Sequence, residues 1–126
     1  LSLDVSRDLD AKYFSQMGLE EYKSLCTILG IYLDNAIEAV IGCNEKQIGL
    51  EIYPEKKDIK IVISNTYGGG LNIKKIDEKG YSTKGIGRGY GLSLVKSILN
   101  KNKMFSQHRK VTKNYYIQHL NIKLDK

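Results

Sequence analysis

Cysteine and histidine are scarce in this sequence, with two residues of each type. The two cysteines, Cys26 and Cys43, are not in a metal-binding spacing and have no histidine nearby. We expect both to be small buried side chains in a reducing cytosol. The two histidines, His108 and His119, fall in a C-terminal region expected to form strands, and we predict ordinary surface or strand positions for them.

Long apolar runs and targeting segments are also lacking. No apolar run approaches the roughly 20 residues that a membrane-spanning helix needs, and the N-terminus does not resemble a secretory signal peptide. The 126 residues are one domain's worth, and 41% of them are hydrophobic, which is enough to bury a core. We therefore predict a single domain over residues 1–126, and because the chain starts at Leu1 we expect it to be part of a longer protein.

The net charge of +6 permits an acidic partner or a polyphosphate ligand without identifying either. Positive residues form one modest cluster: Lys101, Lys103, Arg109, Lys110 and Lys113. Tyrosines are not interleaved with arginine in one strand, as a surface that stacks nucleic-acid bases requires. We expect no nucleic-acid partner, and a basic nucleic-acid-binding module is the alternative from another functional class.

Apolar periodicity predicts both strands and helices. Alternation at period two predicts strands over 1–5, 48–52, 59–63 and 115–124, the first of them half-buried. Helical spacing predicts a core helix from Glu20 to Gly42 and a second helix over 92–100. Residues 13–18 are expected to be a connection, and 54–58 the turn of a β-hairpin. This order of elements is typical of an α+β two-layer sandwich.

Three polar residues, Asp34, Asn35 and Glu38, interrupt the apolar pattern of the first long helix. A buried polar group without a partner costs about 1–3 kcal/mol, so we expect these side chains to share a polar cleft. Asn35 and Glu38 are three residues apart and lie on neighbouring parts of one face. The carboxamide oxygen of Asn35 suits Mg²⁺, although a helix that turns polar near its end gives the same pattern.

A second polar group ends the hairpin. Ser64-Asn65-Thr66 closes the predicted strand, and three glycines follow at 68–70. Glycines at a strand end let the backbone approach a planar ligand. The Asn65 carboxamide can donate and accept hydrogen bonds, as the edge of a nucleobase requires. Taken alone, this pattern is more typical of an Asx turn.

The segment 80–92, Gly-Tyr-Ser-Thr-Lys-Gly-Ile-Gly-Arg-Gly-Tyr-Gly-Leu, feeds directly into the second predicted helix. Glycines let backbone amides approach an anion, and the amides of a helix N-terminus attract phosphate. Lys84 and Arg88 would add charge to this cradle. A Walker loop is excluded because Gly-Lys-Ser/Thr is missing. A dinucleotide fingerprint is excluded because Tyr90 occupies its last position and no strand precedes it.

An asparagine-bearing helix, a strand ending in asparagine and Gly-x-Gly-x-Gly-Leu opening a helix together resemble the GHKL superfamily over nearly the whole chain. That group holds histidine kinases, type II topoisomerases, Hsp90-type chaperones and mismatch-repair ATPases. Leu-Asp-Asn-Ala-Ile-Glu at 33–38 and Gly-Tyr-Ser-Thr-Lys at 80–84 are most similar to the quorum-sensing peptide-receptor kinases of Gram-positive bacteria. The resemblance implies a two-layer α/β sandwich whose mixed, mostly antiparallel sheet is covered on one face by helices.

The resemblance also implies a site for Mg-ATP. Asn35 matches the asparagine that binds Mg²⁺, and Asn65 stands where most members have the aspartate that reads the adenine amino group. The glycines at 87, 89 and 91 match the second glycine box beneath the phosphates, and 71–86 would be the lid. The implied ATP-binding residues are Asn35, Asn65, Lys84, Gly87, Arg88, Gly89, Gly91 and Leu92, with Asp34, Glu38 and Thr83 as further candidates.

Three positions depart from the family pattern. Ile31 stands where many kinases have asparagine and where ATP-hydrolysing relatives have the catalytic glutamate, which argues against an ATPase of that kind. Asn65 replaces the usual aspartate, and Tyr67 replaces the usual first-box glycine. Because a neutral carboxamide accepts a hydrogen bond less strongly than a carboxylate does, we expect weaker nucleotide binding.

The function implied is that of a protein-histidine kinase in a two-component system, on the cytoplasmic side of the bacterial cell membrane. Its domain would pass the γ-phosphate of ATP to a histidine on an adjacent helical dimerisation domain, with a response regulator as further partner. Neither His108 nor His119 fits that acceptor, which normally precedes the domain, so the domain alone is expected to turn ATP over slowly or not at all. Membrane contact is expected only through an N-terminal part outside this chain.

Two alternatives share the same fold. One is a serine protein kinase of the anti-sigma-factor type, which has the same ATP site and a different acceptor. The other is a degenerate GHKL domain that signals by contact alone.

Overall fold

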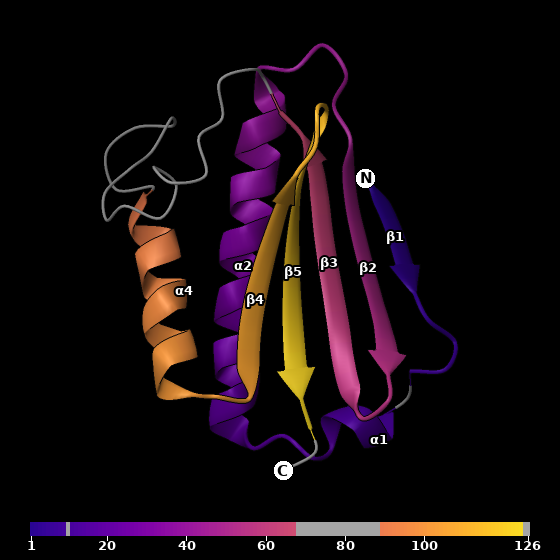
Figure 1. Ribbon diagram of the computed structural model, residues 1–126, viewed down its shortest axis with the longest axis vertical. Helices are drawn as coiled ribbons and strands as arrows, with labels where there is room; N and C mark the ends of the chain where they lie inside the picture. Colours follow the sequence, from indigo (N-terminus) through magenta and orange to yellow (C-terminus); the bar gives the residue numbers. More distant parts are fainter. Residues whose placement is uncertain (10, 68–88, 125–126) are drawn as a thin grey trace.

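One five-stranded sheet lies against two long helices in the computed structural model, which describes residues 1–9, 11–67 and 89–124 (Figure 1). The elements in chain order are β1 (Ser2–Val5), α1 (Ala11–Phe14), α2 (Leu19–Ile41), β2 (Ile48–Glu55), β3 (Asp58–Thr66), α4 (Gly89–Lys101), β4 (Phe105–Val111) and β5 (Tyr115–Lys123). The strand order is β1-β2-β3-β5-β4. β1 is parallel to β2 and the other pairs are antiparallel, so the predicted two-layer sandwich with a mixed, mostly antiparallel sheet is confirmed.

The long helix α2 forms the centre of the core. It begins where the Glu21 carboxylate accepts a hydrogen bond from the backbone N–H of Gly18 at 3.0 Å, and it ends at Gly42. Its buried stripe consists of Leu25, Ile28, Tyr32, Ala36 and Val40. By length and composition this 23-residue helix is apolar enough to cross a membrane, so the expectation that nothing approaches such a length was wrong. The apolar composition is explained by packing of the stripe against the sheet.

The inner face of the sheet supplies the other half of the core. Alternate residues of β3 and β5 point toward the helices, and the paired residues Ile61 and Leu120 are each 1% exposed. The predicted alternation in these two strands is therefore confirmed. The first strand, however, is not half-buried: Leu3 is 66% exposed, because β1 is a four-residue strand at the edge of the sheet, where it pairs only with β2.

Three local expectations need correction. The hairpin turn is shorter than predicted, because Pro54 lies within β2 opposite Ile59 and only residues 56–57 connect the strands. The expected connection at 13–18 begins inside the short helix α1, whose Phe14 carbonyl accepts a hydrogen bond from the Tyr22 hydroxyl. The cysteines are not buried: Cys26 is exposed beside the buried stripe of α2, and Cys43 is half-buried.

Candidate functional site

The first turn of α4 approaches the middle of α2 closely. The two helices lie on the same face of the sheet and run in opposite directions (Figure 1). A Cβ atom placed on Gly91 would lie 3.1 Å from Cγ2 of Ile31, which is tighter than ordinary van der Waals contact. The backbone of Gly91 is helical, so glycine is needed here for close packing rather than for a turn. This contact sets the N-terminus of α4 against α2.

The polar residues of α2 lie on its C-terminal side of the Ile31–Gly91 contact. Asn35 follows Ile31 by one helical turn, about 5–6 Å along the axis, and Glu38 extends the same stripe. Both side chains are half-buried, and the Oε1 atom of Glu38 is buried. Asp34 is exposed, so the three do not share one buried cleft as expected. Asn35 and Glu38 therefore lie on the same stripe of α2 as Ile31, which contacts the first turn of α4, whereas Asp34 faces solvent.

The N-terminal end of α4 is built from the predicted glycine box. Gly89 opens the helix, and Gly91 and Leu92 lie in its first turn. Leu92 is half-buried and packs on the hydrophobic core. The first backbone N–H groups of a helix have no partner within it, and they carry partial positive charge that attracts anions. Four other predicted site residues, Thr83, Lys84, Gly87 and Arg88, lie outside the described residues.

Asn65 is the penultimate residue of β3, and this end of the strand lies near the C-terminal half of α2 (Figure 1). It follows the buried positions Ile61 and Ile63 at period two, so it faces the helices, and it is 3% exposed. Its Nδ2 donates a hydrogen bond to the Thr66 carbonyl oxygen at 2.8 Å. Tyr116 of β5 is its register partner. Asn65 and the first turn of α4 thus lie on the helix-covered side of the sheet, the side on which α2 carries Asn35.

The end of β3 is fixed by two residues that follow Asn65. The Thr66 hydroxyl donates to the Glu45 carbonyl at 2.8 Å and accepts from the Gln47 N–H at 3.1 Å, which ties the strand to the α2–β2 loop. The Tyr67 hydroxyl donates to the Thr112 carbonyl at 2.7 Å, which ties the strand to the β4–β5 turn. Tyr67, at the position expected to be glycine, therefore has a structural role that the sequence did not reveal, because its partner is 45 residues away.

A polar network fixes α2 to the sheet one turn before Asn35. The Tyr32 hydroxyl donates to Oε1 of Gln107 at 2.6 Å, and Nε2 of Gln118 donates to the same oxygen at 3.4 Å. The Tyr116 hydroxyl in turn donates to Oε1 of Gln118 at 3.2 Å. Burial, with a smaller contribution from Tyr116, raises the pKa of Tyr32 well above its ordinary value, so the hydroxyl stays a donor. The network links the helix that carries Asn35 to β4 and to β5, opposite Asn65.

The positive cluster predicted from the sequence is not one patch. Arg109 and Lys110 are adjacent in β4, and successive side chains of a strand point to opposite faces. Arg109 is half-buried on the helix side near Tyr32, whereas Lys110 is exposed on the other face. Arg109 and Lys110 therefore do not contribute to one basic surface.

Comparison with known proteins identifies the family. Residues 21–123 match the family described as the GHKL domain. This chain belongs to the GHKL family. The GHKL domain is 45% identical over 80 residues to the sensor protein CitS of Bacillus subtilis (strain 168), a match that covers 61% of this chain and 15% of CitS. The chain therefore spans only a small part of the length of that relative.

Solved histidine kinase structures share the fold of this GHKL domain. The catalytic domain of histidine kinase ThkA superposes with a TM-score of 0.71 at 19% identity, over 97% of this chain and 76% of that one. The blue-light activated histidine kinase EL346 of Erythrobacter litoralis gives 0.70 at 11% identity, over 98% of this chain and 35% of that one. The resemblance stated from the sequence is confirmed, and the fold is that of a histidine kinase catalytic domain. The closer likeness to quorum-sensing receptors stays a prediction.

Proposed function

We propose that this GHKL domain binds Mg-ATP between α2 and the N-terminus of α4, and supplies the γ-phosphate to a histidine on an adjacent helical domain of the same receptor. The observation that carries the proposal is the Ile31–Gly91 contact, which sets the phosphate-attracting end of α4 one helical turn from Asn35. Membership of the GHKL family, the likeness to the sensor protein CitS and the fold shared with histidine kinase catalytic domains support the same function.

Asn35 and Glu38 fit a magnesium ion. Mg²⁺ takes oxygen ligands and keeps several waters, and the half-buried pair offers a carboxamide and a carboxylate three residues apart on one stripe. Asn35 would hold the ion, with Glu38 beside it. Mg²⁺, when bound, neutralises charge on the phosphates. Backbone N–H groups of the first turn of α4 bind phosphate oxygens from the other side.

Asn65 recognises the adenine base in this proposal. Its Nδ2 is engaged by the Thr66 carbonyl, so Oδ1 is the atom that accepts a hydrogen bond from the amino group of the base. A neutral carboxamide accepts less strongly than the aspartate usual at this position. We therefore expect modest affinity for ATP.

Ile31 directs the chemistry toward transfer rather than hydrolysis. The Ile31 side chain packs on Gly91. At the position of Ile31, ATP-hydrolysing relatives are expected to have a catalytic glutamate. An alkyl group cannot take a proton from water, so this position activates no water molecule. Phosphoryl transfer by such a domain depends on positioning and charge neutralisation. The acceptor histidine, the response regulator and attachment to the cytoplasmic side of the membrane then belong to the longer receptor.

Calorimetric titration with Mg-ATP tests the binding site. We expect saturable binding to the wild type, at least about tenfold weaker binding to Asn35→Ala, and unchanged binding to Asn100→Ala, because Asn100 is an exposed asparagine in the last turns of α4. The same three proteins should show a matching order of thermal stabilisation by the ligand. The proposal fails if Mg-ATP in the millimolar range neither releases heat nor raises the Tm of the wild type, which is the result expected of a domain that signals by contact alone.

A transfer assay tests the acceptor. Mixing the domain with the helical part of its receptor and radiolabelled Mg-ATP should give an acid-labile, base-stable phosphoprotein, as phosphohistidine is. Acid-stable label on serine would instead identify the anti-sigma-factor type of kinase and refute the histidine assignment.

A further inference from the structure

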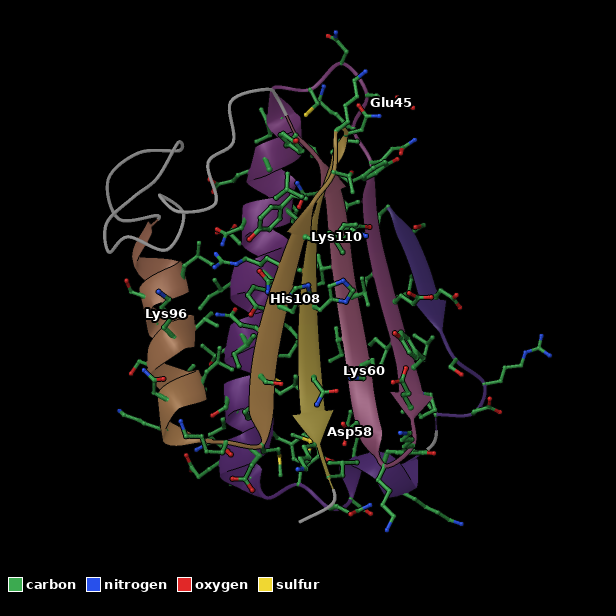
Figure 2. All side chains as sticks on the ribbon, viewed as in Figure 1. Glu45, Asp58, Lys60, Lys96, His108 and Lys110 are labelled. Atoms are coloured by element: carbon green, nitrogen blue, oxygen red, sulfur yellow. The ribbon has the colours of Figure 1, made fainter. Side chains whose placement is uncertain are left out.

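The face of the sheet opposite α2 and α4 carries both histidines of the chain. In the described part of the structure no helix covers this face (Figure 2). On β4 its outward positions include Ser106, His108 and Lys110, which are all exposed. On β5 the outward positions include His119 and Asn121, between the buried residues of the core. The sequence predicted ordinary strand positions for the two histidines and did not place them together.

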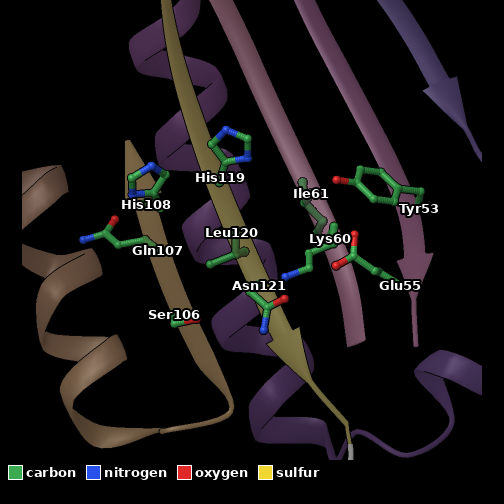
Figure 3. Close-up of a pocket in the computed structure, with 10 residues that line it drawn as sticks. All are labelled: Tyr53, Glu55, Lys60, Ile61, Ser106, Gln107, His108, His119, Leu120 and Asn121. Carbon is green, nitrogen blue, oxygen red and sulfur yellow. The ribbon is translucent and has the colours of Figure 1, made fainter. Parts of the chain in front are cut away.

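His108 and His119 are direct partners in the β4–β5 register. Their ring centroids are 5.7 Å apart, and the rings are tilted by 39°. Figure 3 shows the two imidazoles side by side on adjacent strands, above an open hollow lined also by Tyr53 and Lys60. The pair therefore projects two imidazoles into solvent-accessible space from a rigid antiparallel ladder.

This spacing matches the geometry of two imidazoles on one metal ion. With Zn–N bonds of about 2.0 Å and tetrahedral angles, two coordinated rings have centroids roughly 5.2 Å apart. The observed 5.7 Å differs from that value by an amount that small side-chain rotations supply. The strand register therefore already sets the two rings at a spacing that suits a common ion.

We propose that His108 and His119 together form a binding site for a divalent transition-metal ion of the zinc type, separate from the nucleotide site. Imidazole nitrogen is a preferred ligand of zinc, copper and nickel, whereas magnesium and calcium require oxygen. Among the described residues no group of three or more histidine, cysteine, aspartate or glutamate side chains is so placed that it could hold a metal ion. Water from the hollow would complete the coordination, and the site has two protein ligands.

The surroundings of the pair set the expected strength. Burial, and then His108, Lys110 and Lys60, lower the pKa of His119, while Glu51 raises it. A lowered pKa favours the neutral ring, which is the form that binds a metal ion. The two lysines also oppose a bound cation, so removing one of them should strengthen metal binding. The site is therefore expected to be weaker than a structural zinc centre and to exchange its ion readily.

Zinc titration of the tag-free domain tests the site. Cys26 and Cys43 are first replaced by serine, because thiolates compete for zinc. Calorimetry should show one ion per chain, and NMR should show shifts of both histidine rings. His108→Ala and His119→Ala should each weaken binding by at least about tenfold, Ser106→Ala should leave it unchanged, and Lys110→Ala should tighten it severalfold.

The controls separate this proposal from the proposed nucleotide site. Ser106 points outward from β4 as His108 does but has no nitrogen ligand, so it is the matched control on the same strand. The Asn35→Ala variant, which alters only the proposed nucleotide site, should bind zinc as tightly as the parent. The proposal is overturned if zinc in the millimolar range shifts neither ring, or if the double variant lacking both histidines binds zinc as tightly as the parent. Loss of Mg-ATP binding with zinc binding intact would count against the nucleotide site alone.

Discussion

Substituting Gly91 with alanine is expected to push α4 away from α2. The new methyl group would lie 3.1 Å from Cγ2 of Ile31, a separation at which one of the two helices must move by a few tenths of an ångström. Ile31 belongs to the half-buried layer that packs on the core, so its side chain has little freedom to yield. Any movement of α4 shifts its N-terminus relative to Asn35.

Two opposing terms decide the size of the effect. Replacing glycine by alanine within a helix stabilises the folded state by roughly 0.5–1 kcal/mol. Overpacking a filled contact costs about 1–3 kcal/mol. We expect a net loss near 1 kcal/mol, which for a domain of this size lowers Tm by about 4 °C. Under the proposed function Mg-ATP affinity should fall as well, because the amides proposed to bind phosphate would shift relative to Asn35.

A double-mutant cycle with Ile31→Ala isolates the contact. Without the Ile31 side chain, Gly91→Ala meets no obstacle, and it should then stabilise the domain by about 0.5 kcal/mol. The matched control is Gly30→Ala, an exposed α2 position with no atom within 4 Å of the added methyl, which should stabilise both backgrounds equally. Urea unfolding measures all four combinations. If Gly91→Ala destabilises equally with and without Ile31, the steric argument is refuted.

Two further predictions concern the sheet. Tyr32→Phe removes the hydrogen bond from the Tyr32 hydroxyl to Gln107 and leaves Gln107 less satisfied, so urea unfolding should show a loss of about 1–2 kcal/mol without a change of fold. Burial, first, lowers the pKa of His119 in the folded chain, so the unfolded chain takes up a proton more readily. This contribution to stability is complete above the ordinary histidine pKa of about 6.5 and is lost as the pH falls below it. Between pH 7 and 5 the wild type should thus lose more stability than His119→Gln, and parallel pH profiles would contradict this.

Local sequence predicts most of the elements and the residues of the candidate site. Period-two alternation located β3 and β5 because their inner faces are fully buried, and helical spacing located α2 for the same reason. Asn35, Asn65 and the glycine box were identified because polar residues and glycines are out of place in such patterns. Prediction was weakest for segments that have no alternation of buried and exposed residues. These are the exposed edge strand β1, the one-turn helix α1 and the exposed Cys26.

By itself the sequence determined the fold class and the elements that carry the candidate ATP-binding residues, because backbone propensity and apolar periodicity are local properties. The resemblance of its motifs to a known superfamily indicated the family. Only the tertiary structure decided which side chains meet. Three contacts show this. Ile31 and Gly91 are separated along the chain by β2 and β3, Tyr67 and Thr112 by α4 and β4, and His108 and His119 by the β4–β5 turn. Such contacts depend on register and on helix packing over the whole sheet, which no short stretch of sequence specifies.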